Sequence, residues 1–115
     1  MEEAELELRA RIEVFRASNG DRDLAMAGLY GQLAWLLVRE RRPAEAEPLA
    51  RAAIDAYRSA EPFNEAALIA VLDTLGVALR DVDRLDQAAA IFDEVIRRWS
   101  TTHGASVPLS RIIHR

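Results

Sequence analysis

The sequence contains no cysteine and only two histidines, His103 and His114, both near its C-terminal end. The lack of cysteine excludes disulfides, thiol chemistry and cysteine-based zinc sites, and no metal-ligand spacing surrounds either histidine. The sequence also has no phosphate-binding glycine loop, no nucleophile elbow and no HExxH motif. We therefore expect a protein without a metal, without a cofactor and without an enzymatic activity of its own.

Long hydrophobic runs and blocks of one charge are also missing. No run approaches the roughly 20 apolar residues of a membrane-spanning helix, and the N-terminus is acidic where a secretory signal would be basic. The 15 basic and 19 acidic residues are mixed along the chain, for a net charge of −4. This balance favours neither nucleic acid nor an anionic membrane as a partner. The expectation is a cytoplasmic protein that binds proteins or peptides.

Helix-forming residues, by contrast, are abundant. Half of the 115 residues are hydrophobic, and Ala, Leu, Glu and Arg recur throughout, whereas Val and Ile are too scattered to predict strands. Apolar residues at spacings of three and four indicate amphipathic helices, separated by Pro, Gly, Asn and Asp. The five predicted helices span residues 2–17, 22–40, 44–58, 63–81 and 85–99.

Matched residues recur at an interval of 42 positions. The matched sets are Ala4, Ala46 and Ala88; Ile12, Ile54 and Ile96; and the aromatic residues Phe15, Tyr57 and Trp99. A second group keeps the same interval, with Leu33, Ala34 and Leu37 matched by Leu75, Gly76 and Leu79. Self-similarity at one fixed interval predicts a stack of helical repeats, which usually serves as a surface for other molecules.

The two helix pairs of this stack resemble the tetratricopeptide repeat (TPR), in which Leu and a small residue on the first helix pack against small residues on the second. The first copy is carried by Leu33, Ala34, Leu37, Ala46, Ala50 and Ala53, and the second by Leu72, Leu75, Gly76, Leu79, Ala88, Phe92 and Val95. Residues 44–49 are similar to the helix opening of the kinesin-light-chain-like variety, whose period is 42. Tyr30 and Asp83 depart from the family pattern, and its terminal Pro is absent.

The resemblance covers residues 4–99, as a lone second helix followed by two helix pairs. It implies an all-α, right-handed α-solenoid of antiparallel helix pairs, a TPR-like superhelix of about five helices in residues 1–100. Residues 101–115 are then a tail or the start of an unfinished helix. An irregular helical bundle is the alternative fold.

In this family, partners usually lie in a concave groove lined by the first helix of each pair. On the earlier first helix, residues away from the packing stripe form a row at spacings of three and four: Gly28, Gly31, Trp35 and Val38. The equivalent row on the later helix is Ala70, Asp73, Val77 and Arg80, and Arg39 borders the two rows. The resemblance implies a non-catalytic protein-protein interaction module that binds a peptide or helix of a partner in this groove.

Residues of the earlier row each allow two interpretations. Gly28 and Gly31 cost roughly 1 kcal/mol each relative to alanine inside a helix, so helix propensity does not explain them. They either leave a hollow beside Trp35 that a partner fills, or let the first helix of the chain pack closely. Trp35 is either a large interface anchor or a core residue that covers a helix junction.

The open ends of a short repeat stack favour a different function. Both ends of a solenoid expose apolar faces that further repeats or a capping helix normally cover. Phe15 at one end, or Ile112 and Ile113 at the other, are therefore candidates for burial by a second copy of the chain. A homodimer or larger assembly scaffold would result, and a regulatory subunit of an enzyme is a third alternative.

Arg39, Arg41 and Arg42 form a local basic patch in an otherwise acidic chain. Such a patch ordinarily balances the negative end of a helix dipole, and its alternative use is to hold an acidic segment of a partner. The family members that clamp the C-termini of chaperones use Lys and Asn along the groove. Small, apolar and acidic residues occupy those places here, so that ligand class is not expected.

Overall fold

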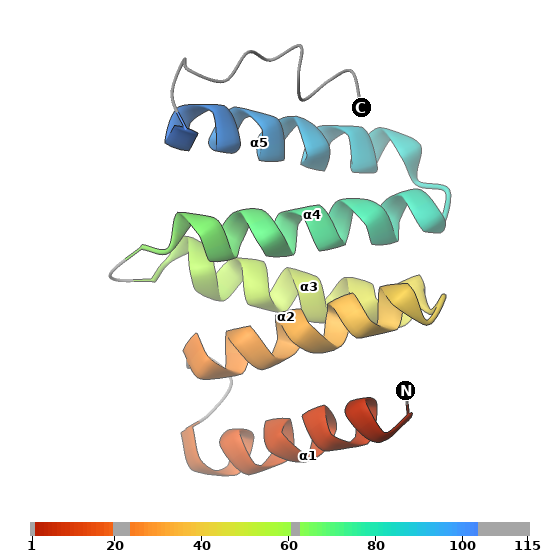
Figure 1. Ribbon diagram of the computed structural model, residues 1–115, viewed down its shortest axis with the longest axis vertical. Helices are drawn as coiled ribbons and strands as arrows, with labels where there is room; N and C mark the ends of the chain where they lie inside the picture. The colour runs from red at the N-terminus through yellow and green to blue at the C-terminus, as the bar shows by residue number, and fades with distance from the viewer. Residues whose placement is uncertain (1, 20–23, 61–62, 104–115) are drawn as a thin grey trace.

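The computed structural model describes residues 2–19, 24–60 and 63–103. These residues form five helices: α1 (Glu2–Asn19), α2 (Leu24–Arg39), α3 (Pro43–Arg58), α4 (Glu65–Asp81) and α5 (Leu85–His103). The described ranges contain no strand, and consecutive helices pack in a stack that follows the chain order (Figure 1). The predicted fold class, an all-α helical repeat solenoid, is therefore confirmed. None of these helices is both long enough and apolar enough to span a bilayer.

The core lies between α2, α3 and α4 and follows the predicted pattern of leucines and small residues. The largest fully buried side chains all come from α2 and α4: Met26, Leu33, Leu37, Leu68, Leu72, Leu75 and Leu79. On α3, Ala46, Ala50 and Ala53 are each 0% exposed, and their small side chains let the leucine-rich helices come close. Because α2 contacts α4 directly while α3 contacts both, α2 and α4 lie side by side against α3.

Local signals in the sequence explain most helix ends. Pro43 is the first residue of α3, where its missing N–H costs nothing, and the Asn64 side chain accepts a hydrogen bond of 3.0 Å from the Ala67 N–H at the start of α4. We expected Pro48 to be confined to the first turn of its helix, but it lies further inside α3, and the helix continues through it. Its side chain is exposed.

The end of α5 differs from the prediction. The helix continues past the predicted end at residue 99 to His103, so residues 101–103 are helical rather than part of a tail. The hydroxyl groups of Thr101 and Thr102 donate hydrogen bonds of 2.9 Å to the backbone carbonyls four residues earlier. These hydroxyls therefore bond within the helix instead of offering its backbone an alternative conformation.

The turns within the two helix pairs have the same backbone geometry, 42 residues apart. Arg41 and Asp83 both have positive φ, at 66° and 70°. The following N–H groups, of Arg42 and Arg84, each bond back to a leucine carbonyl near the helix end, at 2.8 and 2.9 Å. Glycine adopts this left-handed conformation freely, whereas other residues pay roughly 1 kcal/mol or more for it.

Ion pairs with the same spacing join the second helix of one pair to the next pair. Arg42, directly before α3, makes hydrogen bonds of 2.7 and 3.1 Å to the carboxylate of Glu5 on α1. Arg84, directly before α5, lies 3.0 Å from both carboxylate oxygens of Glu47 on α3. The Arg42 hydrogen bond is the main cause of a lowered pKa at Glu5. The register therefore repeats charged contacts as well as apolar ones, and Arg42 is a stacking residue.

Candidate partner-binding groove

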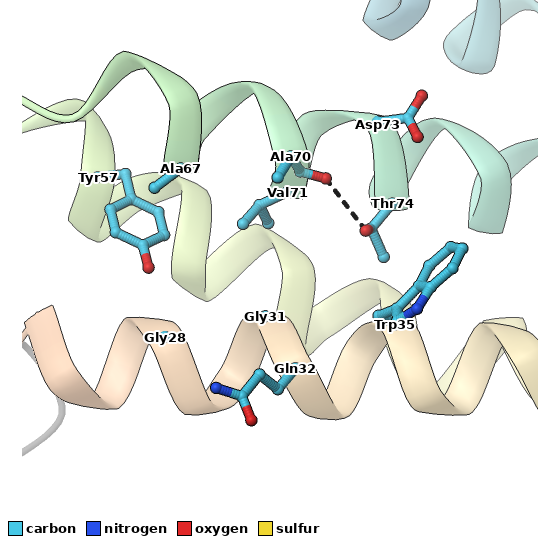
Figure 2. Close-up of a pocket in the computed structure, with 10 residues that line it drawn as sticks. All are labelled: Gly28, Gly31, Gln32, Trp35, Tyr57, Ala67, Ala70, Val71, Asp73 and Thr74. Atoms are coloured by element: carbon cyan, nitrogen blue, oxygen red, sulfur yellow. Dashed lines mark hydrogen bonds between the residues drawn. The ribbon is translucent and has the colours of Figure 1, made fainter.

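A hollow of about 540 Å³ lies between α2 and α4 (Figure 2). Its lining is mostly apolar or small and consists of Gly28, Gly31, Gln32, Trp35, Tyr57, Ala67, Ala70, Val71, Asp73 and Thr74. We call this cavity the Trp35 hollow. Its volume falls within the range of about 300–1,000 Å³ that is typical of ligand pockets.

Small residues on both helices create the Trp35 hollow. The glycines of α2 lie on one side, and Ala67 and Ala70 of α4 lie on the other, where longer side chains would fill the space. Figure 2 shows Trp35 reaching from α2 toward α4 at one end, and Tyr57 reaching from α3 at the other. Three helices therefore build the cavity, and two aromatic side chains bound it.

Trp35 is not a core residue. It is 48% exposed, whereas the two residues before it, Leu33 and Ala34, are 0% exposed and belong to the core. The helical period places Trp35 on the side of α2 away from the packing stripe, as the sequence predicted. The interpretation of Trp35 as a buried cover of the helix junction is therefore wrong, and its exposed ring is available for contact.

The two glycines of α2 do not serve the packing of α1. A Cβ at Gly28 would meet the Tyr57 hydroxyl at 3.7 Å, and a Cβ at Gly31 would meet a methyl of Val71 on α4 at 3.3 Å. The first distance is an ordinary contact, and the second is tight. Gly31 therefore has a packing role against α4, whereas Gly28 keeps open space in the hollow that folding does not require.

The Gly28→Ala variant is expected to be more stable than the wild type, by up to about 1 kcal/mol, because alanine is the better helix former and its methyl group has room. Gly31→Ala should gain less, since Val71 has to move. Urea denaturation followed by circular dichroism measures both changes. A loss of stability in Gly28→Ala would show that the glycine is needed for packing.

Few polar groups reach the Trp35 hollow. Burial is the main cause of a raised pKa at Asp73, partly opposed by Arg80, and burial likewise raises the pKa of Tyr57. The Thr74 hydroxyl donates a hydrogen bond of 3.1 Å to the Ala70 carbonyl within its own helix. The described residues contain no group of three or more His, Cys, Asp or Glu side chains placed to hold a metal ion.

A second hollow, of about 530 Å³, follows the first along the same two helices. Its lining is more polar and consists of Val38, Arg41, Pro43, Val77, Arg80 and Asp81. We call it the arginine hollow. Val38 comes three residues after Trp35 on α2, and Val77 comes three residues after Thr74 on α4, so the two hollows are consecutive sections of one groove.

The structure divides the predicted groove residues between these sections. Those in the Trp35 hollow are Gly28, Gly31, Trp35, Ala70 and Asp73, and those in the arginine hollow are Val38, Val77 and Arg80. Arg39 is exposed at the end of α2 and lines neither hollow.

Lining residues that the sequence did not predict are Gln32, Tyr57, Ala67, Val71 and Thr74 in the first hollow, and Arg41, Pro43 and Asp81 in the second. Extending the row on α4 by one turn before Ala70 would have found Ala67. Asp81, which the sequence places beside Arg80, was available as a border residue on the same pattern.

The predicted self-association residues are not presented as a free surface in the described part of the chain. Phe15 is half-buried and packs against the core, and Ile112 and Ile113 lie outside the described residues. The exposed apolar side chains of α1 are instead Leu6, at 67%, and Val14, at 65%.

Comparison with known proteins gives one match. No curated protein and no solved structure matches the chain. A family model described as the tetratricopeptide repeat matches residues 68–107, a segment that begins in α4 and includes all of α5. The pair formed by α4 and α5, whose turn geometry is repeated 42 residues earlier, is therefore similar to a tetratricopeptide repeat.

Proposed function

We propose that this chain is a non-catalytic interaction module that holds a peptide or helix of a partner protein in the groove between α2 and α4. The observation that carries the proposal is the Trp35 hollow, an apolar cavity beside a tryptophan that folding leaves 48% exposed. Exposed aromatic side chains beside a pocket are frequent anchors of protein interfaces. The match to the tetratricopeptide repeat supports the same function, because such repeats generally bind proteins.

The proposal extends to the variety of the repeat. We infer that both helix pairs belong to the 42-residue, kinesin-light-chain-like form. The supporting observations are the paired turns at Arg41 and Asp83 and the paired contacts of Arg42 with Glu5 and Arg84 with Glu47, all at this spacing. A uniform spacing of contacts keeps successive first helices parallel, and parallel first helices form a continuous groove.

Trp35→Ala is expected to weaken partner binding about tenfold, because a ring of this size contributes more than 1 kcal/mol when a partner buries it. The probe is a set of peptides selected on the wild type from a displayed library of random sequences. Binding of the same synthetic peptides to both proteins, measured by fluorescence anisotropy, gives the ratio of dissociation constants.

Phe63→Ala is the matched control, since Phe63 is also an aromatic residue, 46% exposed, and lies outside both hollows. The proposal fails if Trp35→Ala, with unchanged helicity, binds the peptides as tightly as the wild type. It also fails if Phe63→Ala loses as much affinity.

Self-association is the second candidate function, favoured by the exposed Leu6 and Val14 on α1. These side chains are eight residues apart, so they lie on the same side of the helix, where a second copy of the chain could bury them. Light scattering of a self-associating protein at high micromolar concentration should give at least twice the monomer mass. A monomer under these conditions contradicts obligate assembly.

A further inference from the structure

We infer that the partner segment is acidic as well as apolar: an apolar side chain enters the Trp35 hollow, and Asp or Glu side chains of the same segment bind in the arginine hollow. This inference rests on the proposed function and specifies its partner. The two hollows are consecutive along α2 and α4, so one bound segment spans both.

The charges of the arginine hollow are the first argument. Arg41 and Arg80 line it together with a single acidic residue, Asp81, and Arg39 is exposed beside it. Arg80 lies 3.5 Å from the carboxylate of Asp81, an exposed neighbour in the chain. Within the described ranges, neither Arg39 nor Arg41 forms an ion pair. The groove therefore has an excess of positive charge at this end, although the whole chain carries a net charge of −4.

Arginines elsewhere in the stack are used differently. Arg42, Arg58, Arg84 and Arg98 each bind a glutamate of another helix, at distances between 2.7 and 3.1 Å. The arginine hollow is thus a place where guanidinium groups remain without such partners. A guanidinium group binds a carboxylate through two parallel hydrogen bonds, which makes Asp and Glu its natural ligands.

The backbone of Arg41 is the second argument. Its φ of 66° is the left-handed conformation, which glycine adopts without strain. Arg39 and Arg80 lie in the last turns of their helices, where a positive charge balances the helix dipole. Arg41 lies beyond α2, is exposed and forms no ion pair among the described residues, so folding gives no reason for an arginine there. Strained residues of this kind are concentrated at binding sites.

The geometry also predicts a spacing. Trp35 and Arg41 are six residues apart along α2 and its turn, a distance of roughly 10 Å at the helical rise of about 1.5 Å per residue. An extended peptide covers this distance in about three residues. The acidic side chain should therefore follow or precede the apolar anchor by about three residues in an extended partner, or by about two helical turns in a helical one.

The experiment selects peptides from a displayed library of random sequences on the wild type. Enriched sequences that compete with one another and require Trp35 are synthesised with amidated C-termini, so that side-chain carboxylates are the acidic groups tested. We expect an apolar residue with Asp or Glu at a fixed spacing. Replacement of that Glu by Gln in the peptide should weaken binding about tenfold, and the loss should be smaller at high salt.

Variants of the protein test the site itself. Arg41→Glu should weaken binding of the acidic peptides tenfold or more, and Arg41→Gly about threefold while leaving the fold at least as stable, because it removes the backbone strain. Arg97→Glu is the matched control, since Arg97 is an exposed arginine of α5 outside both hollows.

The outcomes separate this inference from the proposed function. Peptides that require Trp35 but carry no acidic residue overturn the inference and leave the proposed function intact. The same holds if Arg41→Glu and Arg97→Glu weaken binding equally. If no selected peptide requires Trp35, the proposed function fails as well. If a second copy of the chain occupies the groove, binding of the peptides should compete with self-association, and the inference is overturned.

Discussion

Gly76→Ala is expected to lower the free energy of unfolding by about 2–3 kcal/mol. A Cβ at this position would lie 2.6, 2.8 and 3.0 Å from three ring atoms of Phe92, all closer than carbon atoms approach one another without strain. Gly76 is buried between α4 and α5, so the ring and the two helices have to shift together. Such overpacking typically costs about 1–3 kcal/mol, more than the gain in helix propensity. Urea denaturation measures the difference.

A double-mutant cycle tests the cause. In the Phe92→Ala background the same change at Gly76 should no longer destabilise the protein, because the ring that it meets is gone. The first helix pair supports this reasoning: Ala34 and Ala50 occupy the equivalent positions, and both are 0% exposed. A small residue faces a small one there, and glycine faces phenylalanine in the second pair. An equal cost in both backgrounds would contradict the explanation.

The same pair of positions shows why the fold could be predicted from the sequence. Leu33 with Ala34, and Leu75 with Gly76, are matched at the 42-residue interval, and the structure buries all four. A helical period and a repeat period together specify which side of each helix packs and against which neighbour. The end of α5 could not be predicted in this way, because Thr101 and Thr102 favour either a helix end or bonds back into the helix.

The charged contacts were visible in the sequence but were not predicted. Glu5 matches Glu47, and Arg42 matches Arg84, at the same interval as the apolar residues. Each arginine precedes its partner's equivalent by a few residues, so the contact joins different repeats and gives no helical spacing of its own. The basic patch was therefore treated as one unit, although Arg42 is used for stacking and Arg41 faces the groove.

The groove could be predicted only in part, for a related reason. Helical spacing on one helix identified the row from Gly28 to Val38, and the repeat identified its counterpart on α4. Tyr57 belongs to the packing stripe of α3, yet its side chain also closes the Trp35 hollow. A residue that serves the core and the cavity at once cannot be recognised from the period of its own helix. Three helices have to be placed together before Tyr57 becomes part of the site.

Glu94→Gln is expected to lower the free energy of unfolding at pH 7 by about 2 kcal/mol. The Glu94 carboxylate accepts hydrogen bonds of 2.9 and 3.0 Å from Arg58 on α3 and one of 2.8 Å from Arg98 on its own helix. Arg98 also bonds Glu65 of α4, so the cluster ties three helices together. These contacts, chiefly that with Arg58, lower the pKa of Glu94 from 4.5 to about 2. Such a shift corresponds to about 3 kcal/mol, reduced here for solvent screening.

The pH dependence follows from the direction of this shift. Because the folded pKa lies below the unfolded one, Glu94 stabilises the protein fully above about pH 4.5, and the stabilisation is lost as the pH falls toward 2. Glu94→Gln should therefore remove part of the fall in unfolding free energy between pH 5 and pH 2, measured by urea denaturation at each pH. Glu13→Gln is the control, since the Glu13 side chain is 71% exposed on α1. Equal pH profiles for Glu94→Gln and the wild type would show that this carboxylate does not hold the helices together.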